Sequence, residues 1–339
     1  MNAPVPAIDA PETKPSYYRP MKYLSNSSFN LFEENRPKFY RQYLKPDKPP
    51  RDPQNHHMAV GSAFDAYAKS HLHKLIVDDN DPRFEFTTIF EAQVEPQCRD
   101  KALVDGKTVF DAYIKSGALG DLILKLNGCA AKPQFEMTVE GIVNGQRPGV
   151  CLQLGAVPLL GKPDLYFRTN AGIRISADWK VNGFYSKSGV SPTKGFVRLY
   201  PTLERHEDCY PVLLGDVTIN GMLKMEQVDA SWAAQLAMYA WLLGEKVGSD
   251  FVVMIHQLVC RPTGIRVAEL MMQIGEDFQW DLYKRLHDVW YRIQAGEIFD
   301  DMTAEESLVY AKSIDEAPPR PEWMEQTSDR VYFKKKVMA

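Results

Sequence analysis

The sequence predicts an α/β fold in which a central mixed β-sheet is flanked by helices. Helical spacing of apolar residues over 59–75 and within 97–126 predicts the helices, and alternation over 134–140 predicts a strand. A short Asn- and Gly-containing turn at 169–172 separates two further strand-like segments. The chain has 339 residues, 45% hydrophobic and 25% charged, which excludes a disordered or fibrous protein and fits either two domains or one elaborated domain.

Charge and cysteine content exclude several classes of protein. The 40 Lys and Arg residues against 44 Asp and Glu give a net charge of −4, so a globally basic nucleic-acid coat is excluded and any polyanion site must be local. The five Cys residues form no CxxC pair, so neither a disulfide framework nor a zinc or iron–sulfur site is expected. The longest apolar run is far shorter than the ~18 residues that a membrane span needs, so we expect a cytoplasmic protein without a membrane partner.

The N-terminal part predicts a flexible tail followed by a helix. Residues 1–20 are rich in Pro and small residues, which bury too little apolar surface to offset the entropy of ordering. Residues 25–28 would cap a helix, and the segment 36–51 then carries six cations against one anion, with aromatic residues between them. Such a segment can hold a phosphate backbone through Arg36, Lys38 and Arg41, or it can be a solvated helix face.

The middle and C-terminal parts alternate between strand and helix patterns. Residues 134–140 place Glu136 on the polar face of a strand, and strands over 159–168 and 173–181 flank the turn. The stretch 182–228 is longer than an ordinary connection, so we expect an insertion there. A helix over 232–243, two strands within 251–274 and a helix over 276–295 complete a domain expected to span 21–300, before a C-terminal tail at 301–339.

Two carboxylates are predicted to face each other across this hairpin. A turn centred on Ala171 places Asp164 opposite Asp178, because each lies seven residues from the centre. Directly opposed residues have Cβ atoms ~4.5–5.5 Å apart, so the two like charges destabilise the sheet unless a cation lies between them or one carboxylate is protonated. Oxygen-only ligands favour Mg²⁺, with Mn²⁺ as a substitute, over Zn²⁺.

A lysine on the same strand face adds a second element of the predicted site. Lys180 follows Asp178 by two residues and therefore points to the same side. A metal ion beside an ammonium can bind a phosphodiester oxygen and activate water for attack on phosphorus, and Glu136 could complete the coordination or act on the water. Each residue alone reads as a solvated surface group, but the combination indicates phosphodiester hydrolysis.

These residues resemble a known nuclease signature. Gly161-Lys162-Pro163-Asp164, followed by Asp178-Trp179-Lys180 on a hairpin strand, is similar to the motif of the PD-(D/E)XK nuclease superfamily. Gln235 and Tyr239 match the QxxxY motif of its RecB-like branch, which includes the phage λ-type exonucleases, and residues four apart share one helix face. The resemblance implies a restriction-endonuclease-like core over roughly residues 25–295.

The resemblance also implies roles for individual residues. Asp164 and Asp178 would bind the metal, with the backbone carbonyl of Trp179 as a further ligand, and Lys180 would orient or stabilise the nucleophile. Glu136 and Asp65 would be secondary ligands; the related helix usually presents a His where this chain has Asp65.

Three further residues are assigned to substrate binding by the same resemblance. Gln235 and Tyr239 would position the active site or the DNA strand, and Ser28 lies in a helix similar to the N-terminal helix of that branch. The Cys cluster that binds iron–sulfur in some relatives is absent from this sequence, so no such cluster is expected.

The function implied is that of an Mg²⁺-dependent DNA exonuclease acting in recombination or DNA end processing, encoded by a phage or mobile element. Its partners would be DNA and a recombinase or single-strand annealing protein, and a homo-oligomer is a further expectation. Two alternatives stay open. One is a structure- or site-specific endonuclease, and the other is a non-catalytic DNA-binding subunit that keeps the nuclease fold.

Overall fold

The computed structural model describes residues 21–45, 49–50, 52–146, 153–182, 212–214, 223–261 and 264–294. These residues fall into two compact units. The smaller unit holds the described parts of 27–50 and 288–294 together with residues 21–22, and the larger unit holds residues 23–26 and the described parts of 52–287. The predicted tails and most of the predicted insertion at 182–228 lie outside the described residues.

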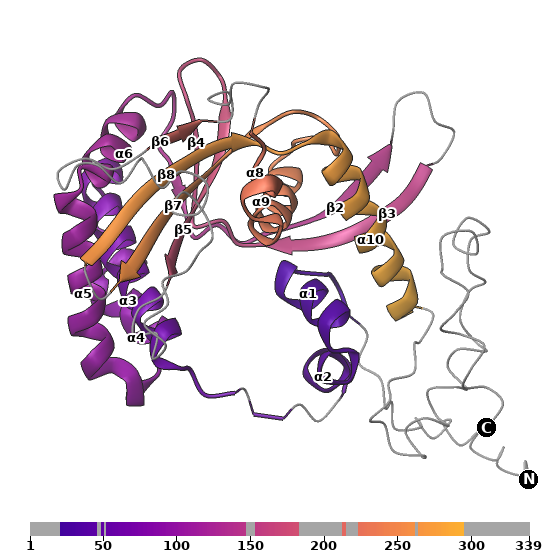
Figure 1. Ribbon diagram of the computed structural model, residues 1–339, viewed down its shortest axis with the longest axis horizontal. Coiled ribbons are helices and arrows are strands. Elements are labelled where there is room, and N and C mark those ends of the chain that lie inside the picture. Colours follow the sequence, from indigo (N-terminus) through magenta and orange to yellow (C-terminus); the bar gives the residue numbers. More distant parts are fainter. Residues whose placement is uncertain are drawn as a thin grey trace, which may run out of the picture. The chain divides into compact units, whose positions relative to one another are not determined.

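The larger unit is built on a mixed six-stranded sheet with strand order β1-β4-β5-β7-β8-β6 (Figure 1). The strands are β1 (Gln134–Phe135), β4 (Leu165–Arg168), β5 (Arg174–Asn182), β6 (Val212–Leu214), β7 (Val252–Arg261) and β8 (Gly264–Gln273). The β5–β7 and β6–β8 pairs are parallel, and the other neighbours are antiparallel. The predicted α/β class with a central mixed sheet is therefore confirmed, and it is consistent with a restriction-endonuclease-like core. Part of the predicted insertion, β6, is an edge strand of this sheet.

Helices cover both faces of the sheet. Those of the larger unit are α3 (His56–Leu72), α4 (Phe86–Gln93), α5 (Arg99–Lys115), α6 (Ala118–Asn127), α8 (Met225–Val228), α9 (Ala230–Leu242) and most of α10 (Glu276–Gln294), with the π-helix η2 (His73–Val77) and the 3₁₀ helices η3 (Pro82–Phe84) and η4 (Pro96–Cys98). Trp179 of β5 hydrogen-bonds to α5, whereas the next residue, Lys180, hydrogen-bonds to α9. Because successive strand residues point to opposite faces, α5 and α9 lie on opposite sides of the sheet (Figure 1).

The smaller unit contains α1 (Asn26–Glu34), α2 (Arg36–Phe39), the π-helix η1 (Tyr40–Leu44) and the end of α10 (Glu276–Gln294). Phe32 packs edge-on against Phe39 with ring centroids 5.1 Å apart. The guanidinium groups of Arg36 and Arg292 lie over the Phe32 ring, 5.5 and 5.4 Å from its centroid.

In the part of the chain that the structure describes, no helix is both long and apolar enough to cross a membrane.

The register of the predicted hairpin is confirmed. β4 and β5 are antiparallel, with Leu165 opposite Ala177 and Arg168 opposite Arg174. Both pairs are centred on Ala171, as the position of the turn predicts. One further step in this register leads from Leu165 to Asp164 and from Ala177 to Asp178.

Two of the predicted strands are wrong, because each is interrupted at the residue that carries a candidate acid. The segment 134–140 is not one strand: β1 ends at Phe135 and β2 (Val139–Gln146) begins four residues later. Glu136 has φ +52, a left-handed backbone that stops a strand. β2 pairs instead with β3 (Gln153–Gly161) in a separate two-stranded sheet.

The predicted strand 159–168 is likewise divided into β3 and β4. The interruption contains Pro163, which has no N–H to contribute to a sheet. The two interruptions meet, because the Glu136 N–H donates to the Asp164 carbonyl oxygen over 3.2 Å. Glu136 and Asp164 thus reach the same end of the hairpin because both lie at interruptions between strands, not because they share the face of one strand.

The position of α3 is set by its close contact with α5. A Cβ at Gly106 of α5 would lie 2.5 Å from the Ala63 Cβ and 3.0 Å from the Phe64 backbone nitrogen, so only glycine allows this approach. The side chains of Val60 and Phe64 are fully buried, and their cluster continues into α5 and the sheet.

We expect Gly106→Ala to lower the free energy of unfolding by about 1–3 kcal/mol, because the two helices must separate to admit the methyl group. Urea denaturation measures this change. Gly120→Ala in α6 is the matched control: its Cβ meets nothing within 4 Å, so the gain in helix propensity should stabilise the protein by about 0.5–1 kcal/mol. Equal effects of the two substitutions would contradict the close contact.

Candidate active site

Three carboxylates from separate parts of the fold meet beside α3. Asp65 lies on α3, Glu136 follows β1 and Asp164 precedes β4. Each offers an oxygen atom within 4.8 Å of the others, and we call this group the carboxylate triad. Their side chains are 16, 17 and 21% exposed, so the triad is neither fully buried nor freely solvated. The sequence predicted all three as candidate ligands, and the structure brings them together.

A buried lysine lies at the centre of the triad. Lys69, one turn after Asp65 on α3, has a side chain only 1% exposed. Its ammonium donates to Asp65 Oδ2 over 2.6 Å and to Asp164 Oδ1 over 2.9 Å, and it forms an ion pair with Glu136 Oε1. The sequence analysis missed Lys69, although its spacing of four from Asp65 is the spacing that pairs charges along a helix.

Burial and the lysine shift the acidities of the triad in different directions. Burial raises the pKa of Asp65 to about 6, while the Lys69 ammonium opposes this rise. Burial acts in the same direction on Asp164, but there the Lys69 ammonium, a hydrogen bond with Asp178 and the Lys180 charge together outweigh it, and the pKa of Asp164 lies below its ordinary value. The pKa of Lys69 is raised, because Asp164 and Asp65 overcome the effect of burial. Lys69 therefore carries its charge at neutral pH.

A second cluster lies between β5 and α9. Asp178 is buried and forms an ion pair with Lys180. The Lys180 ammonium donates to Gln235 Oε1 over 2.8 Å, and Gln235 Nε2 donates to the Tyr239 hydroxyl oxygen over 2.9 Å and to Asp178 Oδ1 over 3.5 Å. We call these four residues the β5–α9 cluster. The glycine of the Gly-Lys-Pro-Asp motif makes room for it, since a Cβ at Gly161 would lie 2.7 Å from the Tyr239 ring.

Asp164 connects the triad to the β5–α9 cluster. Its Oδ2 accepts a hydrogen bond from the backbone N–H of Trp179 over 3.3 Å, beside Asp178 in the chain. Asp178 is not one of the three carboxylates that share a centre. Burial raises its pKa to about 7, with a further rise from the Asp164 charge and an opposing effect of Lys180. In the structure Asp164 pairs with Lys69 and Asp178 with Lys180, and the two carboxyl groups are hydrogen-bonded to each other. The predicted ion shared by both aspartates stays a prediction.

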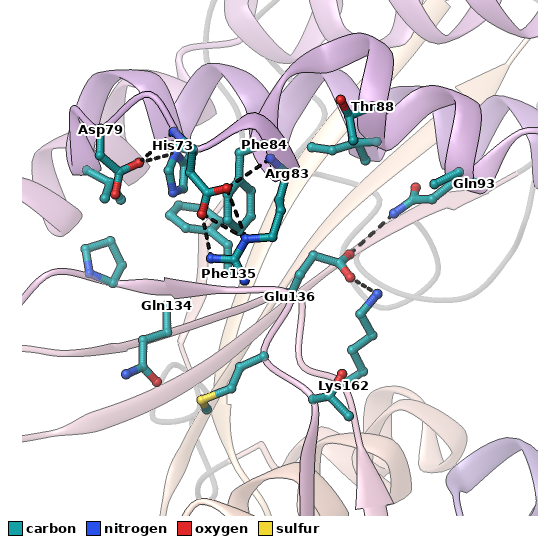
Figure 2. Close-up of a pocket in the computed structure, with 17 residues that line it drawn as sticks. His73, Asp79, Arg83, Phe84, Thr88, Gln93, Gln134, Phe135, Glu136 and Lys162 are labelled. Atoms are coloured by element: carbon teal, nitrogen blue, oxygen red, sulfur yellow. Dashed lines mark hydrogen bonds and ion pairs between the residues drawn. The ribbon is translucent and has the colours of Figure 1, made fainter.

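Two clefts give solvent access to the triad. The larger, of about 900 Å³, is bordered by Glu136 and Lys162. Figure 2 shows Gln93 and Lys162 reaching Glu136 from two sides, and Lys162 forms an ion pair with Glu136 Oε2. A smaller cleft of about 190 Å³ is bordered by Asp65, Asp164 and Gln93. The carboxylates can therefore be reached from outside, whereas Lys69 approaches them from the protein interior.

A buried polar chain holds β5 from the face opposite Asp178. Trp179 Nε1 donates to the Tyr113 hydroxyl oxygen over 3.3 Å, and that hydroxyl lies 2.5 Å from His256 Nδ1. His256 Nε2 is 2.9 Å from Glu269 Oε2, and Lys125 pairs with the same oxygen at 2.8 Å. Trp179, His256 and Glu269 are register partners on three adjacent strands. No local sequence pattern indicates these polar contacts, because they depend on the register of β7 and β8.

The remaining predicted substrate-binding residues belong to the smaller unit. Ser28 is 1% exposed within α1, Arg36 stacks on Phe32, and Lys38 and Arg41 lie in α2 and η1. A role in DNA binding for these four residues stays a prediction.

Comparison with known proteins gives little similarity. No protein-family model matches the chain, and no curated protein matches it. A solved structure of a Eubacterium rectale protein, described as a candidate exonuclease, shares 13% identity over 91% of this chain and 93% of that chain, with a TM-score of 0.40. The solved structure of SSO0001 shares 14% identity over 73% of this chain and 79% of that chain, with a TM-score of 0.25. Similarity at this level carries no argument about function.

The raised pKa of Asp178 predicts how a neutral substitution affects stability. The pKa of Asp178 is about 7 in the folded protein and 3.8 ordinarily. Between these two pH values the native protein therefore holds a proton on Asp178 that the unfolded chain has lost. The stability conferred by that proton is full below the ordinary value and is lost as the pH rises through about 7. Asp178→Asn keeps the neutral form, so its stability relative to wild type should increase from pH 5 to pH 8, by at most about 3 kcal/mol.

Thermal unfolding of both proteins with EDTA across this range measures the difference. A gap that stays constant or narrows with rising pH would show that Asp178 is ionised throughout.

Proposed function

We propose that the chain is a metal-dependent deoxyribonuclease that hydrolyses phosphodiester bonds. The observation that carries this proposal is the carboxylate triad joined through Asp164 to the Asp178–Lys180 pair. Acidic ligands beside a fixed ammonium form a site that can hold a divalent ion and a phosphate together. The resemblance of 161–164, 178–180 and 235–239 to the nuclease signature supports the same reaction.

The donor set fits a hard divalent ion. Asp65, Glu136 and Asp164 supply only carboxylate oxygens, which suit Mg²⁺ or Mn²⁺, and they converge within 4.8 Å. Asp178 and the backbone carbonyl of Trp179 are proposed as further ligands. When bound, the ion supplies Lewis acidity that stabilises the negative charge developing on the phosphate.

Lys180 is proposed to act on the phosphate as a cation and hydrogen-bond donor. Burial lowers the pKa of Lys180, but Asp178 together with Asp164 and Asp229 raises it by more, so the ammonium is charged at neutral pH and is not a base. Gln235 fixes the ammonium through its carbonyl oxygen and is itself held by Tyr239. Burial raises the pKa of Tyr239 to about 12, so its hydroxyl stays protonated and can donate to a DNA phosphate.

An exonuclease is preferred to an endonuclease because Gln235 and Tyr239 share the QxxxY spacing of the phage λ-type enzymes. The proposal therefore also includes a role in recombination or end processing. It includes a recombinase or single-strand annealing partner and a phage origin as well. The discriminating experiment incubates the protein with linear and covalently closed DNA, with Mg²⁺ or EDTA. An exonuclease shortens only the linear DNA, and an endonuclease nicks or linearises the closed circles.

One observation favours a second candidate, a non-catalytic DNA-binding subunit. The Lys69 ammonium contacts all three carboxylates of the triad, so the site is neutralised in part without a divalent ion. A protein of this kind binds DNA but cleaves neither substrate at any Mg²⁺ concentration.

Removing the proposed catalytic ammonium should abolish cleavage. Lys180→Ala is expected to lower kcat on linear DNA by roughly 100-fold or more, because the phosphate loses a charged donor that is oriented in advance. DNA affinity, measured by fluorescence anisotropy, should change little. Lys107→Ala, which removes an exposed lysine paired with Asp111 on α5, is the control and should keep full activity. Near-normal turnover of Lys180→Ala would remove Lys180 from the mechanism.

Removing a ligand oxygen should weaken metal binding directly. Asp164→Asn is expected to reduce the affinity for Mn²⁺ by about tenfold or more, because an amide replaces a charged ligand shared by both halves of the site. Isothermal titration calorimetry measures this change. Asp111→Asn, an exposed carboxylate on α5, is the control and should bind Mn²⁺ as the wild type does. Unchanged affinity in Asp164→Asn would exclude this aspartate as a ligand.

A further inference from the structure

We propose that Lys69 is an intramolecular competitor of the divalent ion. Its ammonium occupies the centre of the carboxylate triad, so the ion can be shared by the three carboxylates only after that ammonium has left. This inference rests on the proposed function, because it concerns the same carboxylates. It assigns to Lys69 a role in setting metal affinity.

The oxygens that Lys69 contacts are the ones a shared ion would need. Each of the three carboxylates gives one oxygen to the ammonium: Asp65 Oδ2, Glu136 Oε1 and Asp164 Oδ1. The second oxygens of two of them have other partners, since Asp164 Oδ2 accepts from the Trp179 N–H and Glu136 Oε2 pairs with Lys162. The ammonium and a triad-bound ion would therefore compete for the same oxygen atoms.

The ammonium and the ion approach from different directions. The Lys69 side chain is 1% exposed, and its stem runs through the interior of the α3 packing. The carboxylates are 16–21% exposed and border the two clefts. An incoming ion thus reaches the carboxylates from the clefts, while Lys69 contacts them from the interior.

Charge explains why the chain keeps a lysine at this place. Three carboxylates within 4.8 Å of one another repel when no cation is present. Lys69 supplies one positive charge from the interior, and Lys162 supplies another at the rim of the larger cleft. The lysine lets the triad assemble before metal binds, and the same contacts must be broken when the ion enters. Lower metal affinity is the consequence.

The test compares Mn²⁺ binding to the full-length wild type and to Lys69→Met, by calorimetry and by the Mn²⁺-induced change in Tm. Methionine is unbranched and one atom shorter than lysine, and it removes the charge. The expected result is Mn²⁺ binding about tenfold tighter or more in Lys69→Met, with a larger rise in Tm on adding Mn²⁺. Binding to Lys69→Met that is equal to or weaker than wild-type binding would overturn the inference.

Two further variants make this result specific. Lys162→Met removes a positive charge beside Glu136 but leaves the Lys69 ammonium among the three carboxylates. The Mn²⁺ affinity of Lys162→Met should therefore rise by less than that of Lys69→Met. An equal rise would mean that net charge alone sets the Mn²⁺ affinity. Should Lys69→Met not fold, Asp65→Asn is compared with Asp65→Asn/Lys69→Met. The double variant has one carboxylate fewer and should still bind Mn²⁺ more tightly than the single variant.

The outcomes separate this inference from the proposed function. Mn²⁺-dependent cleavage by the wild type, with no gain in affinity on replacing Lys69, leaves the nuclease in place and removes the competitor role. An absence of Mn²⁺ binding in both the wild type and Lys69→Met, at up to millimolar Mn²⁺, removes both.

Discussion

Electrostatic repulsion among carboxylates is the constraint on which the rest of this site depends. The fold places Asp65, Glu136 and Asp164 close enough to share one ion and limits their exposure to water. Such a group needs a cation or a bound proton, and the chain provides the Lys69 ammonium from within. The same demand for a counter-charge recurs one strand away, where Lys180 accompanies the buried Asp178. The site is thus two acidic centres, each held by a lysine, which meet at Asp164.

Glu136 and Asp164 lie at irregular backbone positions between strands and not within regular strands. Glu136 adopts a left-handed conformation that ends β1, and Pro163 separates β3 from β4 directly before Asp164. A hydrogen bond from the Glu136 N–H to the Asp164 carbonyl joins the two breaks. Conformations of this kind are costly, and they tend to be kept where a side chain must leave the regular pattern of the sheet. Here the result is that acids from separate strands reach α3.

The sequence predicted the parts of the site that depend on local spacing. The turn centred on Ala171 set the β4–β5 register, and that register led to Asp164 and Asp178. The helix that carries Gln235 and Tyr239 was also predicted, because its apolar pattern and its end at a glycine are local properties. The alternation of apolar and polar residues over 134–140 predicted one continuous strand, which is wrong. The alternation continues past Glu136, although the chain leaves one sheet there and enters another.

Features that depend on packing could not be predicted in the same way. Lys69 resembles any surface lysine in the sequence, and only the approach of α3 to the ends of β1 and β4 makes it a partner of three acids. Tyr113, His256 and Glu269 form one chain only when α5, β7 and β8 are in register. The need for glycine at position 106 follows only from its close contact with Ala63 of α3. These are contacts between residues far apart in the sequence, which no local pattern encodes.

The most direct measurement is anomalous diffraction from crystals soaked in Mn²⁺. The account predicts a manganese peak at coordinating distance from carboxylate oxygens of Asp65, Glu136 and Asp164, with the Lys69 ammonium displaced from their centre. A manganese peak elsewhere in the molecule, or no peak while Lys69 keeps its three contacts, would contradict it.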